Sequence, residues 1–188
     1  GDFVDFLDPM AVRTFINLTY EQYYRRFPEH FGSTIRMSFF DDLAAYHASG
    51  SRLWTGAMAQ QFRADTGRDP APYYRALWES IGEDTEASRW AFHHVPNRLF
   101  SEGYPGVTSA WCAARGVVGS GHPAGAYQPN PLEGPGDAML FYQHQGCPLT
   151  DSIHYYGHGR DGFKVPASAA WNFDRPMVAC ETYGNFNP

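Results

Sequence analysis

The chain has 188 residues, 43% of them hydrophobic and 18% charged, so it is long enough for one domain with a core and too apolar to be disordered. Its formal net charge of -6 argues against nucleic-acid binding, and the absence of any apolar run of about 18 residues argues against a membrane span. Aromatic residues make up 16% of the chain, which favours a binding site lined by rings, such as a sugar site.

The first half of the chain predicts mainly helices. A helix is expected over residues 8–32, because Asp8 is a good N-cap, Pro9 suits the first helical turn, and Gly32 follows the last apolar repeat. The β-branched and aromatic residues 35–40 predict the first strand. Further helices are predicted over residues 52–70, 71–82 and 84–116, the last disturbed at Pro96 and at residues 103–105.

The second half alternates between strands and helices. Strands are predicted at 117–122, at the start of 151–159, and at 177–181, with helices at 137–146 and 165–176 between them. This order is typical of a parallel α/β sheet, and we expect residues 1–188 to form a single domain of (β/α)-barrel type or a fragment of one.

Polar and aromatic side chains follow each predicted strand. In parallel sheets these positions share one edge, where binding and catalytic sites form. The residues in question are Asp41 and Asp42, then Ser120 and His122, then Tyr155, Tyr156 and His158, and finally Glu181, Thr182 and Tyr183.

The carboxylates at this edge suggest acid–base chemistry. Glu181 leaves an apolar strand, and a partly desolvated carboxyl group there suits a general acid. Asp42, together with Asp41, would supply the second carboxylate, and two carboxylates are what glycosidic bond cleavage uses. A purely structural interpretation stays open, in which Glu181 is a surface or capping residue and the two aspartates cap the next helix.

Two alternatives come from other classes of protein. One is a carbohydrate-binding domain without turnover, in which a truncated barrel keeps its aromatic surface but lacks the catalytic pair. The other is a metal-dependent hydrolase built on His122, His154 and His158, although the spacing of the last two crosses a predicted strand and not one helical face. No other metal-ligand pattern is evident, and Cys112, Cys147 and Cys180 have no CxxC spacing and are expected to be buried thiols.

The stretch "GFKVPASAAWNFDRPMVACETYGNF" (162–186), with "SFFDD", "RLWTGAMAQQF", "RALWESIG" and "SGH" before it, resembles the catalytic barrel of bacterial α-L-rhamnosidase-type glycoside hydrolases (glycoside hydrolase family 106 and relatives). The resemblance covers nearly the whole chain. It implies a TIM-type (β/α)₈ barrel and hydrolysis, with inversion, of plant or microbial polysaccharides or oligosaccharides, α-L-rhamnosides included. It also implies Glu181 as one catalytic glutamate and a secreted or periplasmic location. In such a hydrolase we expect the substrate to be contacted by His122, Tyr155, Tyr156, His158, Tyr183 and Trp54.

The chain departs from that family at three points. Asp42 stands where relatives tend to carry a glutamate, which retracts the carboxylate by about one methylene. The loop after His122 reads Pro-Ala-Gly-Ala where relatives often carry an acid, so no cofactor is expected and calcium enters by resemblance alone. Four recognisable strands are half the number in a full barrel, so we expect a partial barrel whose open sheet edge a second copy could cover in a homodimer.

Overall fold

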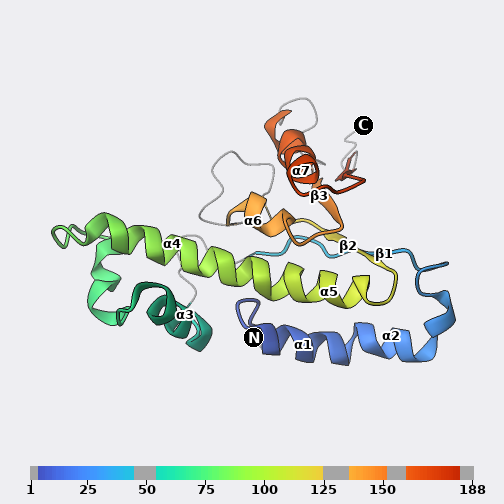
Figure 1. Cartoon of the computed structure of the whole chain (residues 1–188), viewed down its shortest axis with the longest axis horizontal. Coiled ribbons are helices and arrows are strands. Elements are labelled where there is room, and N and C mark those ends of the chain that lie inside the picture. The colour runs from blue at the N-terminus through green and yellow to red at the C-terminus, as the bar shows by residue number, and fades with distance from the viewer. Residues whose placement is uncertain (1–3, 45–53, 125–135, 152–159, 183–188) are drawn as a thin grey trace, which may run out of the picture.

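The computed structural model describes residues 4–44, 54–124, 136–151 and 160–182. Helices α4 and α5 form a long rod beside a short sheet, with α1 and α2 along one side of the rod and α6 and α7 near the end of the sheet (Figure 1). The elements are α1 (Pro9–Leu18), α2 (Tyr20–Arg26), η1 (Pro28–His30), β1 (Met37–Ser38), α3 (Gly56–Thr66), η2 (Ala71–Leu77), α4 (Thr85–Ser101), η3 (Glu102–Gly106), α5 (Val107–Ala113), β2 (Val118–Gly121), α6 (Ala138–Tyr142), β3 (Cys147–Asp151), α7 (Arg160–Asn172) and β4 (Ala179–Glu181).

The sheet has four strands in the order β1-β2-β3-β4, and every pair is parallel. Helix α5 packs against β2 and α7 packs against β3. Within the described residues the sheet is open, with β1 and β4 at its edges. The predicted fold class, parallel (β/α) units forming part of a barrel, is therefore confirmed.

The helix predicted over residues 8–32 is divided into α1, α2 and the 3-10 helix η1. Its start is as predicted, since the Asp8 side chain accepts a hydrogen bond from the Met10 N–H and Pro9 occupies the first turn. The break falls at Thr19, whose hydroxyl donates to the Phe15 carbonyl at 2.7 Å and whose backbone leaves the helical region. Helical periodicity alone did not reveal this break.

The predicted disturbance of the long helix lies at one of its two expected places. Pro96 is accommodated within α4, whereas residues 102–106 form the π-helix η3, which contains Gly103 and Pro105. Pro105 lacks an N–H, so the ordinary helical ladder cannot continue through it. A Cβ on Gly103 would lie 2.2 Å from the Phe6 carbonyl oxygen, so glycine there lets the N-terminal segment lie against the rod.

The prediction of the third strand was wrong. The strand is β3, Cys147–Asp151, and not the segment beginning at Asp151; residues 152–159 lie outside the described residues. All five β3 residues are buried, so the strand lacks the alternation of a half-exposed strand, and Pro148 argued against any strand there. The other three strands lie where they were predicted, but they are shorter than predicted. The helix predicted over residues 71–82 is the 3-10 helix η2, and α7 begins and ends earlier than the helix predicted over residues 165–176.

Aromatic residues form much of the core between the rod and the sheet. The Phe141 ring is fully buried, and its centroid lies 5.9 Å from that of Phe40 and 5.4 Å from that of Phe100. Phe40 thus fixes the segment after β1 onto the core, one residue before the first candidate carboxylate. Among the described residues, no helix has the length and apolar character needed to cross a membrane.

Candidate active site at the carboxyl edge of the sheet

Backbone hydrogen bonds between the first two strands continue beyond their formal ends. The Phe40 N–H donates to the Ser120 carbonyl at 3.3 Å, and the His122 N–H donates to the Phe40 carbonyl at 3.4 Å. One step further, the Leu43 N–H donates to the His122 carbonyl at 3.3 Å. Asp41, Asp42 and His122 therefore stand on a paired backbone, which holds a site more rigidly than an unsupported loop does.

His122 is the centre of the site. Its side chain is fully buried. Its Nε2 lies 3.1 Å from an oxygen of Asp41 and 3.4 Å from an oxygen of Glu181, and its Nδ1 lies 3.7 Å from an oxygen of Asp42. The structure thus brings together the three predicted catalytic residues around a histidine that the sequence assigned to substrate binding.

Both ring nitrogens of His122 face carboxylates, but neither contact has the angles of a hydrogen bond. They are close contacts between carboxylate oxygens and a ring that is shielded from water, so charges at this site are screened less than at an exposed surface.

Sequence reasoning missed Asp151 as a site residue. It is the last residue of β3, is 7% exposed, and pairs in register with Glu181 of β4. One oxygen of Asp151, one oxygen of Asp42 and a nitrogen of His122 lie within 4.8 Å of one another. The sequence assigned Asp151 to the start of a strand, and placing the strand one segment earlier would have put it at the functional edge.

Several predicted substrate-binding residues cannot be placed. Tyr155, Tyr156, His158 and Tyr183, together with His154 of the metal alternative, lie outside the described residues. Trp54 is described, and its ring packs edge-on against Tyr74 at 5.3 Å in the helical layer. A ring that the sequence did not single out, Phe39, lies nearer the site, with its centroid 5.8 Å from that of His122, and it is 49% exposed.

In the part of the chain that the structure describes, two sets of side chains have the spacing of metal ligands, and His122 belongs to both. The first contains Asp41 and Glu181, and the second contains Asp42 and Asp151. Each set combines two carboxylate oxygens with an imidazole nitrogen. Calcium takes about six to eight oxygen ligands, so these mixed donor sets do not fit it well, whereas transition metals accept both donor types.

The comparisons with known proteins agree with this fold. The chain is similar to a segment of a solved structure described as a rhamnosidase from Novosphingobium sp. PP1Y, with a TM-score of 0.75 and 21% sequence identity. The match covers 96% of this chain but only 17% of that chain, so it establishes a shared fold over a part of a much longer protein. No protein-family model matches the chain, and no curated protein matches it.

Proposed function

We propose that the chain carries the acid–base site of a glycoside hydrolase, with α-L-rhamnosides as the first substrates to test. The observation that supports this most is the convergence of Asp41, Asp42 and Glu181 on His122 at the carboxyl edge of a parallel sheet. Glycoside hydrolysis needs two carboxyl groups in unlike environments, one to protonate the leaving oxygen and one to activate water or attack carbon. The likeness of fold to a rhamnosidase adds to the proposal.

In this proposal Glu181 is the general acid. Its carboxyl group lies 3.4 Å from Nε2 of His122 and its side chain is 41% exposed, so it contacts the buried ring and is still partly accessible to solvent. Asp41 approaches the same nitrogen, with one oxygen within 4.8 Å of an oxygen of Glu181. Glu181 is the less exposed of the two side chains, at 41% against 67%, and we therefore assign it, and not Asp41, to protonation of the leaving oxygen.

Asp42 is the general base in this proposal. Inverting enzymes keep about 6.5–9.5 Å between their two carboxyl groups so that a water fits between them. Asp41 is too close to Glu181 for that role, whereas Asp42 approaches the other ring nitrogen of His122. If Asp42 and Glu181 are the catalytic pair, we therefore expect inversion of the anomeric centre. Retention needs about 5–5.5 Å between the two carboxyl groups, and it is the outcome expected if Asp41 and Glu181 are the pair.

The test is the release of aryl leaving groups from a panel of glycosides, with the stereochemistry of the first sugar product followed by NMR. Glu181→Gln keeps the size of the side chain but cannot donate a carboxyl proton, so we expect a loss of about 10²-fold or more with an ordinary phenol leaving group. Asp69→Asn is a matched control, since Asp69 is an exposed carboxylate whose partner Arg63 belongs to α3. Sugar binding without product release by a folded chain would favour the carbohydrate-binding alternative and contradict hydrolysis.

A metal-dependent hydrolase is the second candidate, because the first mixed donor set contains a buried, unbonded imidazole nitrogen. Asp41, His122 and Glu181 would hold the ion, and the ion would supply an activated water. Elemental analysis of the purified chain, followed by titration with Mn²⁺ and Zn²⁺, tests this candidate. Loss of stoichiometric metal in His122→Gln would support it, whereas activity that persists in a metal-free preparation would refute it.

A further inference from the structure

A pocket lies at the opposite end of the sheet from the carboxylates. It has a volume of about 380 Å³ and adjoins the amino ends of β2 and β3, where Val118, Gly119 and Gly146 contribute to its wall. Its polar lining consists of Ser109 from α5, Gln143 and His144 after α6, and Arg175 from the segment between α7 and β4. The glycosidase proposal uses none of these residues.

Two groups in this pocket are buried donors without a hydrogen-bond partner. They are the Nε of Arg175 and the hydroxyl of Ser109, which is 8% exposed as a residue. Arg175 also donates from Nη2 to the Gln143 carbonyl at 2.7 Å, which fixes the guanidinium in place. Among the ion pairs of the described residues none involves Arg175, so its positive charge has no carboxylate partner there. Buried donors left unbonded are costly, and they indicate a position that an acceptor would fill.

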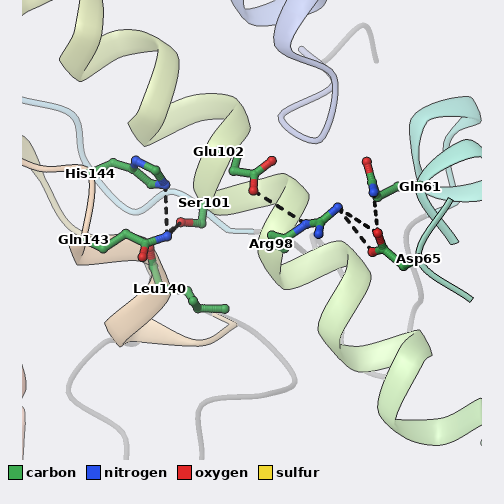
Figure 2. A network of polar contacts seen from close by, with 8 residues as sticks. All are labelled: Gln61, Asp65, Arg98, Ser101, Glu102, Leu140, Gln143 and His144. Carbon is green, nitrogen blue, oxygen red and sulfur yellow. Dashed lines mark hydrogen bonds and ion pairs between the residues drawn. The ribbon is translucent and has the colours of Figure 1, made fainter. Parts of the chain in front are cut away.

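His144 adds a third donor. The Gln143 amide nitrogen lies 3.0 Å from Nε2 of His144, so Nε2 is the acceptor and the ring proton is on Nδ1 (Figure 2). Nδ1 faces Gly106, another pocket residue, since a Cβ built on Gly106 would lie 3.7 Å from it.

Two charged groups act on His144. Burial, followed by the positive charge of Arg175, lowers the pKa of His144, while Glu102 raises it. Figure 2 shows the Glu102 carboxylate directed toward Arg98, at 3.6 Å from its Nε. That ion pair reduces the repulsion that Glu102 would exert on an incoming anion.

We propose that this pocket binds an oxyanion, a carboxylate or phosphate group of a small molecule, through Arg175, Ser109 and His144. A guanidinium suits the planar or tetrahedral oxygens of such groups, and the hydroxyl and the imidazole N–H supply two further donors. The site faces away from the candidate active site, so it does not depend on the glycosidase proposal. An acidic sugar or a sugar phosphate is the class of ligand that combines this chemistry with a pocket of this size.

The test is isothermal titration calorimetry of the chain with inorganic phosphate, with glucuronate, and with uncharged glucose, at constant ionic strength. We expect phosphate or glucuronate to bind and glucose not to bind at this site, and the stronger of the two anions identifies the source of the oxyanion. Arg175→Gln should weaken binding by about tenfold or more, and Ser109→Ala by a smaller factor. Arg13→Gln, a change at an exposed arginine of α1, is the matched control.

The pH dependence gives an independent readout. Because the bound anion favours the protonated ring of His144, affinity should increase as the pH falls, and His144→Gln should lose this dependence. Binding of neither anion would overturn the proposal, as would equal affinities in Arg175→Gln, Ser109→Ala and the parent chain. Should Arg175→Gln not fold, Ser109→Ala decides the result, since it removes one hydroxyl at the wall and leaves the guanidinium in place.

Discussion

The central role of His122 can be tested by replacing the ring with a neutral side chain of similar bulk, as in His122→Gln. The ring contacts both Asp41 and Glu181, so its replacement leaves these two carboxylates with oxygens within 4.8 Å of each other and without the imidazole that both contact. The variant should be destabilised because both carboxylates remain at this edge of the sheet. Asp41→Asn, added in the same chain, should then restore part of the lost stability.

The size of the effect follows from the separation of the two carboxylates. Two unit charges at 4.8 Å repel by about 3.5 kcal/mol at an effective dielectric constant of about 20, and by about 0.9 kcal/mol in bulk water. The Asp41 side chain is 67% exposed and that of Glu181 is 41% exposed, so solvent screens part of the repulsion. We therefore expect Asp41→Asn to stabilise the His122→Gln variant by about 1–2 kcal/mol at low salt.

The assay is urea unfolding at pH 7 of the parent, both single variants and the double variant. In the parent, Asp41→Asn also removes the contact of Asp41 with the ring at 3.1 Å, so it should stabilise the parent less than it stabilises the His122→Gln variant. Repeating the cycle at 1 M salt should shrink the coupling, since the Debye length falls to about 3 Å. An equal effect of Asp41→Asn in both backgrounds would refute the idea that the His122 ring is what makes the two neighbouring carboxylates compatible.

Four further predictions can be checked with standard measurements. Burial lowers the pKa of His144, so as the pH falls through about 6.5 the unfolded chain protonates this ring before the folded chain does. The free energy of unfolding should therefore decrease on acidification. A pH series of His144→Gln should show a flatter slope. Gly121→Ala should cost more than about 2 kcal/mol in urea unfolding, because Gly121 has φ +148 and its Cβ would lie 2.5 Å from the Phe40 carbonyl oxygen, whereas Gly56→Ala, with nothing within 4 Å, should stay within about 1 kcal/mol of the parent. If calcium is not a ligand of this site, adding EGTA should leave glycosidase activity unchanged, and a loss restored by Ca²⁺ alone would contradict the donor-set argument. A homodimer that covers the β1 edge should appear in analytical ultracentrifugation and be lost in Met37→Lys, since Met37 is 40% exposed on that strand; a monomeric parent would refute the dimer.

The fold class could be predicted because local signals agreed with the tertiary structure at the ends of elements. The Asp8 cap with Pro9 marks the true start of α1, and Gly67 and Gly116 adopt the left-handed backbone expected where a helix ends. Three of the four strands were found from short β-branched, small or apolar runs beside such signals. Bounds were less accurate, since these strands have only two to four residues, and backbone hydrogen bonds between the segments of β1 and β2 extend beyond the strands themselves.

The part of the site that escaped prediction depends on long-range burial. Strand β3 was not predicted because it contains Pro148 and its sequence does not alternate between apolar and polar residues. A strand that is covered on both faces has no polar face, so it lacks that alternation. Asp151 was therefore not seen as a partner of Asp42 and His122. The surroundings of His122 were equally beyond local reasoning, since the carboxylates near it come from the ends of β1, β3 and β4, which lie far apart in the sequence.

The backbone at Asp42 connects the fold to the proposed chemistry. Asp42 has φ 41, a left-handed conformation that aspartate tolerates better than most residues, and it lies between two backbone hydrogen bonds that join His122 to Phe40 and Leu43. Consecutive residues of a regular strand point to opposite faces, so Asp41 and Asp42 could not both approach one ring on an extended backbone. The left-handed turn at Asp42 removes that restriction and lets the two carboxylates reach different nitrogens of His122. The end of one strand in this sequence therefore places two carboxylates against one buried imidazole. This arrangement gives the candidate site carboxylates in unlike positions, as the proposed chemistry requires.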